Sequence, residues 1–254
     1  MSQSIWTRCG GASNARSYEG EAWRVVESQQ LIGTRKLVAS DAEHELLEQL
    51  IDGAKPPPPR GPEFEGVHYL LATSFRYPPL RYGSRFGTRA QPGIWYGAED
   101  IGTAFAEVAY YRLVFLDGTA ADIAPLMVEL TAFQAALRTD RAVDLTAGAF
   151  AEHDATISSP TTYDATQALG AAMREDGIVL FRYRSARDAI AGACIGLFGP
   201  RAFVRKQPHN FEHWHCVVDR RSVEMSRKHF LEKGHFAFPR AQFEVDGAIP
   251  SPAN

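Results

Sequence analysis

A short acid-free stretch of the sequence holds residues whose types suit binding of a charged, aromatic ligand. No aspartate or glutamate occurs between Glu65 and Glu99. The stretch contains these arginines and aromatic residues: Arg76, Arg81, Arg85, Arg89, Phe75, Tyr77, Tyr82, Phe86, Trp95 and Tyr96. Guanidinium groups bind phosphate through paired, charge-assisted hydrogen bonds, and aromatic rings offer flat faces to a base. The stretch therefore predicts a nucleotide site, although arginines that cover aromatic surface in a solvated loop would give the same composition.

A glutamate follows this stretch in a segment that is otherwise apolar. Asp100 is placed to cap a helix that runs to about Leu116, and Glu107 and Arg112 are the charged residues within it. A helix of this composition is expected to be largely buried, and a buried carboxylate needs a partner or a function. We therefore expect Glu107 to serve chemistry beside the bound nucleotide. The alternative is a surface acid without a specific task.

The other candidate site residues are one serine and a pair of histidines. Residues 178–181 predict a short buried strand, and Ser185 follows it between Arg184 and Arg187. On the residues alone a turn or cap hydroxyl is the favoured interpretation of Ser185, with ligand binding as the alternative. His213 and His215 would share one face of a strand, but their spacing matches no standard zinc pattern. We expect no metal.

The elements that must position these residues indicate an α+β fold. Ser40 and Asp41 predict the start of a helix to Ile51, and prolines 56–59 form a stiff, extended joint. We expect an N-terminal appendage at residues 1–60 and a main domain at residues 61–254. Strands are predicted at residues 67–72, 93–97, 126–130, 141–145, 191–198 and 214–218, with a turn at 83–87 and a helix beginning at Ser159-Pro160. Without regular alternation of strands and helices, this order favours α+β over a doubly wound sheet.

Composition narrows the function classes. The chain has 254 residues, 27 lysines and arginines against 30 acids, and 45% hydrophobic residues, which suits a globular domain that does not bind duplex nucleic acid. Its three cysteines are isolated, which argues against a disulfide framework and mildly favours a reducing compartment. The N-terminus resembles no secretory signal, and no apolar run is long enough to span a membrane. The sequence thus predicts a cytoplasmic protein with no membrane partner.

Taken together, these motifs resemble the RES-domain family, named for an arginine, a glutamate and a serine. The resemblance covers roughly residues 67–205. It rests on Phe-Arg-Tyr at 75–77, Gly-Ser-Arg-Phe at 83–86, Trp-Tyr-Gly-Ala at 95–98, Ala-Glu at 106–107, Gly-Ile-Val-Leu-Phe at 177–181 and Ser-Ala-Arg at 185–187. Arg85 to Tyr96 and Tyr96 to Glu107 are each eleven positions, which is the spacing expected of the family's core.

The resemblance implies a fold similar to ADP-ribosyltransferase toxins, with NAD+ as the substrate. Family members are the toxins of RES/Xre toxin–antitoxin modules, which consume NAD+ by phosphorolysis or hydrolysis and are held inactive by an Xre-family helix-turn-helix antitoxin. The resemblance further implies that Arg76 and Arg85 bind the pyrophosphate of NAD+, and that Tyr96 and Tyr77 surround the nicotinamide and its ribose. Glu107 would stabilise the oxocarbenium-like transition state, and Ser185 would orient ribose or nicotinamide. Glu107, Arg76 and Ser185 are thus the expected catalytic residues.

Two other functions remain open at this point. One is a mono-ADP-ribosyltransferase, in which a protein side chain replaces phosphate or water as the acceptor. The other is a non-catalytic module that binds a nucleotide or single-stranded RNA, since stacking combined with positive charge also suits that task. An acid near phosphates weakens binding, so Glu107 argues against the second of these.

Overall fold

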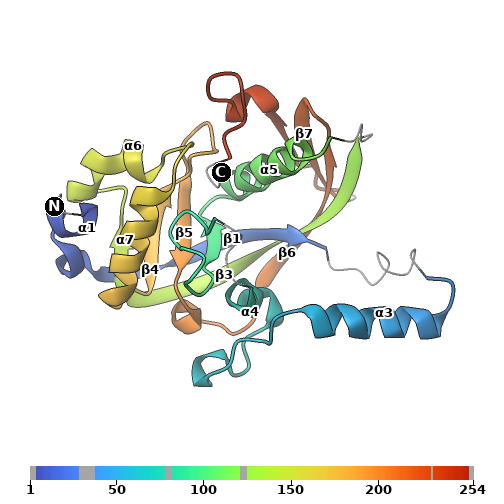
Figure 1. Ribbon diagram of the computed structural model, residues 1–254, viewed down its shortest axis with the longest axis horizontal. Helices are drawn as coiled ribbons and strands as arrows, with labels where there is room; N and C mark the ends of the chain where they lie inside the picture. The colour runs from blue at the N-terminus through green and yellow to red at the C-terminus, as the bar shows by residue number, and fades with distance from the viewer. Residues whose placement is uncertain (1–3, 29–37, 78–81, 121–124, 230, 252–254) are drawn as a thin grey trace.

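A mostly antiparallel sheet of eight strands forms the centre of the molecule, flanked by helices (Figure 1). The computed structural model describes residues 4–28, 38–77, 82–120, 125–229 and 231–251. The strand order is β1-β2-β5-β4-β3-β6-β7-β8, and the only parallel pairing among these described strands joins β3 to β4. The predicted α+β class, with a mixed and largely antiparallel core, is confirmed.

Pairing of strand β1 with strand β3 determines the shape of this sheet. The strands are β1 (Arg16–Glu27), β2 (Trp95–Ala98), β3 (Leu126–Asp144), β4 (Leu180–Arg184), β5 (Ala193–Leu197), β6 (His209–Val218), β7 (Ser222–Arg227) and β8 (His235–Pro239). Strand β1 pairs with β3 along most of its length and with β2 through the single register pair Trp23–Ala98. Strands β1, β2, β5, β4 and β3 therefore close into a ring, and β6, β7 and β8 extend the sheet from the other edge of β3.

Three hydrophobic clusters attach the helices other than α3 to this sheet. The helices are α1 (Ile5–Arg8), α3 (Asp41–Ala54), α4 (Tyr69–Arg76), α5 (Ile101–Asp117), α6 (Asp154–Ile157) and α7 (Asp164–Glu175), and short 3-10 helices join several elements. Helices α1 and α7 pack with β4 and β5, α5 packs against β6, β7 and β8, and α4 packs over Trp95 and Phe133. Figure 1 shows α5 and α7 as separate helices with the strands running between them.

Helix α5 follows the prediction closely at its ends. Asp100 accepts a hydrogen bond from the backbone amide of Gly102, which satisfies one of the free donors at the helix start. The helix ends at Asp117, one residue beyond the predicted end at about Leu116. Its buried face is formed by residues such as Phe105, Ala109 and Leu113, and the partly buried Val108 packs against the same core cluster.

Other predicted elements differ from the structure. Residues 69–76 form helix α4 and not a strand, because the His68 ring caps the first turn by accepting from the Leu70 amide at 3.2 Å. The two strands predicted at 126–130 and 141–145 are parts of one strand, β3. The predicted helix start at Ser159-Pro160 is wrong: the Ser159 hydroxyl accepts from the amides of Thr161 and Thr162 in a turn, and α7 begins at Asp164.

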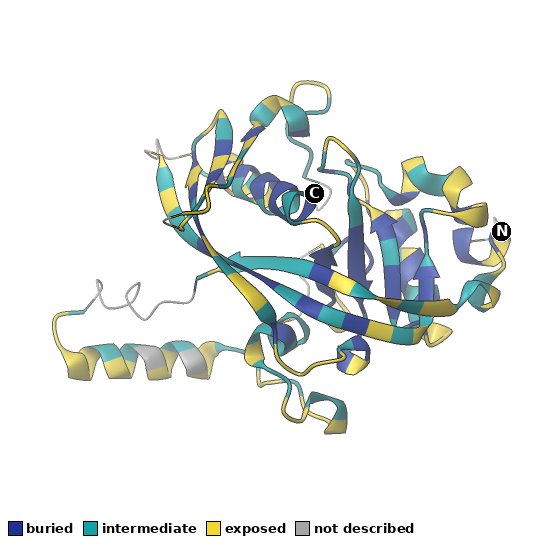
Figure 2. Ribbon diagram, turned by 180° about the vertical axis from the view of Figure 1, so that it is seen from behind, coloured by how far each residue is buried: buried dark blue, intermediate teal, exposed yellow. Residues whose placement is uncertain are grey.

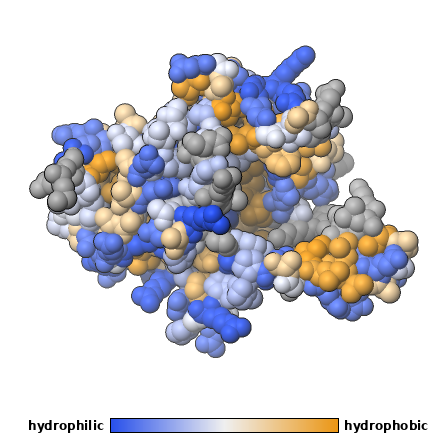
Figure 3. Space-filling view, viewed as in Figure 1, coloured by the Kyte–Doolittle hydropathy of each residue, from blue (hydrophilic) through white to orange (hydrophobic). Residues whose placement is uncertain are grey.

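The predicted boundary at residue 60 does not separate two bodies. Strand β1 lies before that boundary and is paired to β3 inside the sheet, while Ile5 and Trp6 of α1 belong to a core cluster. An appendage therefore does not describe residues 5–27. Helix α3 does extend away from the sheet (Figure 2), and its Leu46 and Leu50 are 56% and 63% exposed. Figure 3 shows the resulting apolar surface on α3.

Candidate active site

A cleft of about 550 Å³ lies between β1, β2 and α5, with residues from distant parts of the chain on its walls. A cavity of this size suits a ligand with the dimensions of a nucleotide. Its walls are mainly apolar and aromatic. Its lining residues include Trp23, Val25, Tyr96, Val108, Tyr111, Phe115, Leu130, Tyr163 and Tyr183, together with the charged residues Arg24, Glu27, Arg85, Glu107 and Arg112.

Glu107 and Ser185 meet at this cleft, although 78 positions separate them. The Ser185 hydroxyl donates to Glu107 Oε1 at 2.6 Å. The same hydroxyl oxygen accepts from the backbone amides of Arg187 at 3.0 Å and Asp188 at 3.1 Å. Because those two amides occupy the lone pairs of the oxygen, its single proton is directed to Glu107. Ser185 therefore caps the turn that follows β4 and also fixes the carboxylate.

The turn that carries Ser185 is attached to α5 at a second point. Thr103 lies one helical turn before Glu107, and its hydroxyl donates to Asp188 Oδ2 at 2.6 Å. Arg187 is buried, donates to the Pro160 carbonyl at 3.0 Å and places its guanidinium 3.5 Å from the centre of the Tyr110 ring. These contacts hold the 185–188 turn against α5, so the Ser185–Glu107 hydrogen bond joins two rigid elements.

The predicted turn at 83–87 is present and is attached to β2 through Tyr96. Gly83 has a φ of +85°, and a Cβ added there would lie 2.3 Å from the Gly87 carbonyl oxygen, so only glycine fits. The Tyr96 hydroxyl accepts from the Phe86 amide at 3.2 Å and lies 3.0 Å from the Ser84 hydroxyl. Burial raises the pKa of Tyr96 to about 12, so this phenol stays neutral at physiological pH.

Arg85 is buried beside this turn, with 5% of its surface exposed. Its Nη1 donates to the carbonyls of Ile157 and Ser159 at 3.2 and 2.8 Å, and its guanidinium lies 4.8 Å from the Tyr163 ring centre. Desolvation alone would lower the pKa of Arg85, but Tyr163 and Glu107 outweigh it and raise the pKa. Arg85 is thus a fixed cation on the cleft wall.

Glu107 carries the negative charge at this end of the cleft. Burial, followed by the field of Glu107, raises the pKa of the Cys194 thiol well above its ordinary value, and burial does the same for the Tyr183 phenol. Both groups are therefore neutral at physiological pH. The Cys194 sulfur lies 3.9 Å from Glu107 Oε1.

The structure does not bring Arg76 and Tyr77 to the cleft. Arg76 is the last residue of α4, and its Nε donates to the Pro56 carbonyl at 2.6 Å. Tyr77 follows it and is 40% exposed, and neither is among the described residues that line the cleft. Of the predicted site residues, the structure places Arg85, Tyr96 and Glu107 on the cleft wall and Ser185 in direct contact with Glu107.

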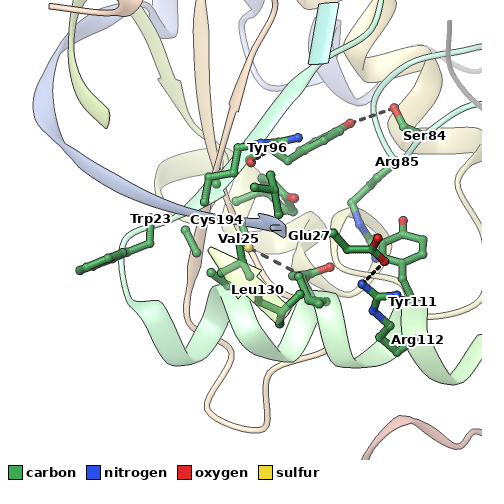
Figure 4. Close-up of a pocket in the computed structure, with 18 of the residues that line it drawn as sticks. Trp23, Val25, Glu27, Ser84, Arg85, Tyr96, Tyr111, Arg112, Leu130 and Cys194 are labelled. Carbon is green, nitrogen blue, oxygen red and sulfur yellow. Dashed lines mark hydrogen bonds and ion pairs between the residues drawn. The ribbon is translucent and has the colours of Figure 1, made fainter. Parts of the chain in front are cut away.

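The cleft is also lined by two arginines that the sequence analysis did not propose as site residues. Arg24 of β1 donates to the Tyr96 carbonyl at 2.5 Å, and burial lowers its pKa to about 10. Its Nε is buried and has no hydrogen-bond partner among the described residues. Arg112 of α5 forms an ion pair with Glu27 of β1, and Figure 4 shows this pair beside Tyr111. In the sequence, Arg112 was notable only as the second charged residue of an apolar helix. Arg24 lies in β1, about forty residues before the acid-free stretch begins, so sequence spacing could not connect it with the arginines of that stretch.

None of the helices in the described residues combines the length and apolar character that a membrane span requires. The described residues also contain no group of three or more histidine, cysteine or carboxylate side chains that could hold a metal ion.

Comparison with known proteins gives one family. The chain matches no curated protein. The RES domain model matches residues 60–219, which is more than half of the chain and includes Arg85, Tyr96, Glu107 and Ser185. With these residues gathered at one cleft, the chain belongs to the RES domain family.

Proposed function

We propose that this protein is an enzyme that cleaves the nicotinamide–ribose bond of NAD+. The observation that carries the proposal is the 2.6 Å hydrogen bond from Ser185 to Glu107 at an aromatic cleft that also holds Arg85. An oriented carboxylate supplies negative charge, aromatic walls pack against nicotinamide, and arginine donates hydrogen bonds to phosphate. Membership of the RES domain family supports the same reaction class.

The proposed mechanism uses charge that develops during bond cleavage. As the C1′–N bond breaks, positive charge builds on the nicotinamide ribose and the bonding electrons leave with neutral nicotinamide. Glu107 stabilises that charge more in the transition state than in the substrate, which is the condition for a faster reaction. Ser185 acts as a positioning residue that holds Glu107, and phosphate or water then attacks C1′.

The same geometry gives roles to Arg85 and the tyrosines. In the described residues, Arg85 forms its hydrogen bonds through Nη1, which leaves Nε and Nη2 to donate to the phosphate next to the nicotinamide ribose. Tyr96 and Tyr183 form an enclosed wall that suits the nicotinamide ring and excludes water. Arg76 and Tyr77 would act on NAD+ only if α4 moved toward the cleft.

We further propose a cellular role as a toxin that depletes NAD+ and that an Xre-family helix-turn-helix antitoxin restrains. This role is supported by family membership alone. A purified antitoxin that blocks NAD+ turnover in a stoichiometric titration would support it, and undiminished turnover at saturating antitoxin would argue against it.

The test of the reaction is a phosphorus NMR time course of the purified protein with NAD+, with and without inorganic phosphate. Loss of NAD+ that requires phosphate, with a new ADP-ribose-1″-phosphate signal, establishes a phosphorylase. Loss that gives ADP-ribose regardless of phosphate establishes a glycohydrolase. Unchanged NAD+ in both samples contradicts the proposal and would favour a protein acceptor or a binding module.

A further inference from the structure

The open end of the cleft contains a group of side chains to which the proposed reaction gives no role. These are Glu27 at the end of β1 and Arg112 and Phe115 on α5. We propose that this end is the subsite for the adenosine half of the dinucleotide, where Phe115 packs against the adenine ring and Arg112 contacts the adenosine-side phosphate. The inference rests on the proposed function, because it takes Glu107 to lie beside the nicotinamide ribose.

The spacing along α5 sets the direction of the ligand. Glu107, Tyr111 and Phe115 are four positions apart, lie on one side of the helix and all line the cleft. At about 1.5 Å of rise per residue, the eight positions from Glu107 to Phe115 span about 12 Å. The cleft wall thus continues for two helical turns beyond the carboxylate, in the direction in which a second riboside would extend.

The two ends of the cleft are enclosed to different degrees, which decides which half of the ligand fits where. The end near Glu107 is lined by Arg85 at 5% exposure, Tyr183 at 4% and Tyr163 at 7%. The other end has Phe115 at 62%. A compact ring fits the enclosed end, and the longer adenosine half must extend through the open one.

Phe115 is unusual within its helix. Its neighbours Leu113 and Leu116 are 0% and 3% exposed, whereas Phe115, like Tyr111 one turn earlier, is exposed at the cleft, which Val26, Val108 and Leu130 also line. A large exposed aromatic ring on a concave, apolar surface is typical of a binding site. A nucleic-acid base fits such a ring because every base has a flat π-face.

Arg112 supplies the charge for this subsite. Its ion-pair partner in the described part of the chain is Glu27, whose side chain is 59% exposed. Ion pairs with an exposed partner are weak, because water and salt compete for both groups. A phosphate of the dinucleotide's pyrophosphate can therefore replace Glu27, and the planar guanidinium suits two parallel hydrogen bonds to phosphate oxygens.

The test compares NAD+ with nicotinamide mononucleotide, which has the scissile bond but lacks the adenosine half. The variants are Phe115→Ala and Arg112→Gln, with rates of nicotinamide release measured over a range of substrate concentrations. For Phe115→Ala we expect kcat/KM for NAD+ to fall about tenfold or more, in line with the loss of one base–aromatic stack. Both variants should leave kcat/KM for the mononucleotide unchanged.

Matched controls separate this effect from general damage. Phe211→Ala removes a phenylalanine on β6 that is 48% exposed, and Arg227→Gln removes an arginine that pairs with Glu212 and Glu232. Neither Phe211 nor Arg227 is among the described residues that line the cleft. Both controls should turn over NAD+ like the wild type. Equal losses on NAD+ and on the mononucleotide, or no loss on NAD+, would overturn the subsite.

A binding measurement keeps this inference separate from the proposed function. If the wild type cleaves neither substrate, the proposed reaction is wrong, and calorimetric titration with ADP-ribose then decides the subsite. Wild-type binding that each variant weakens about tenfold would support it, through a lost stack in Phe115→Ala and lost charge-assisted hydrogen bonds to phosphate in Arg112→Gln. No wild-type binding, or equal binding by the variants, would overturn it.

Discussion

The two ends of the cleft differ in how firmly their side chains are held. At the enclosed end, Ser185 and Tyr96 each make several hydrogen bonds to backbone or side-chain partners, and Arg85 bonds two carbonyls. At the open end, Phe115 is exposed and Arg112 is held by one exposed acid. Charge stabilisation needs groups fixed before the reaction, whereas a binding surface tolerates adjustment. The difference indicates chemistry at one end and recognition at the other.

The largest effect among the positioning residues is expected for Ser185→Ala. It removes the hydrogen bond to Glu107, and a hydrogen bond to a charged group contributes about 1.5–3 kcal/mol. At 1.36 kcal/mol per tenfold, kcat should fall about 10- to 100-fold. Steady-state kinetics on NAD+ should show this fall in kcat with little change in KM.

The Ser185 prediction has a built-in control. Ser185→Thr keeps the hydroxyl and should recover much of the lost kcat, although the added methyl group must fit a residue that is 3% exposed. Thermal unfolding of both variants checks the fold, since Ser185→Ala also leaves two amides without their acceptor. A rise in KM with unchanged kcat would place Ser185 in binding and would weaken the contrast between the two ends.

A smaller effect of opposite sign is expected for Glu27→Gln at the open end. The substitution removes the acid that competes with phosphate for Arg112. Since exposed ion pairs contribute about 0.2–1 kcal/mol, KM for NAD+ should fall by at most about fivefold, with kcat unchanged. Steady-state kinetics at low ionic strength gives the clearest measurement. A higher KM would mean that Glu27 itself helps to bind the ligand.

The smallest effect concerns stability and not activity. Asp117, the last residue of α5, accepts from Arg240 Nη1 and Nη2 at 2.7 Å, and this hydrogen bonding lowers the pKa of Asp117 below its ordinary value of 3.8. A lowered pKa in the folded state means stability that is present above pH 3.8 and is lost as the pH falls below that value. Asp117→Asn should therefore destabilise the protein by up to about 1 kcal/mol at pH 7.

Thermal unfolding of the wild type and Asp117→Asn at several pH values tests this. The difference in Tm should be constant between pH 5 and 7 and should shrink below about pH 4. NAD+ turnover should not change, because Asp117 lies outside the described lining of the cleft. A difference in Tm that grows on acidification would contradict the assignment of the lowered pKa.

The sequence predicts those parts of the fold that depend on local signals. Asp100 marks the start of α5 correctly, since a side-chain cap acts within a few residues. The apolar run at 67–72 was misassigned because six residues without a clear period fit a strand or a helix equally well. The cap at His68, an uncommon residue at that position, decided the outcome.

The candidate site likewise contains residues that the sequence predicts and contacts that only tertiary packing creates. Glu107 could be picked from its apolar surroundings, and Arg85 and Tyr96 from the acid-free stretch together with the resemblance to RES domains. The contact between Glu107 and Ser185, in contrast, depends on how α5 packs against the turn after β4. The contributions of Arg24 and Glu27 depend on closure of the sheet by β1, a pairing between segments more than a hundred residues apart. Arg76 had the right residue type in the acid-free stretch, yet α4 points its guanidinium toward Pro56.

The most direct test of the central claim is release of nicotinamide from NAD+ by the wild type and by Glu107→Gln, measured side by side by chromatography. The substitution keeps the shape of the side chain and removes its charge. We expect the wild type to release nicotinamide and the variant to do so at least about a hundredfold more slowly, as when a transition-state charge loses its partner, with an unchanged unfolding temperature. Comparable release by the two proteins would contradict the role of Glu107 and the account built on it.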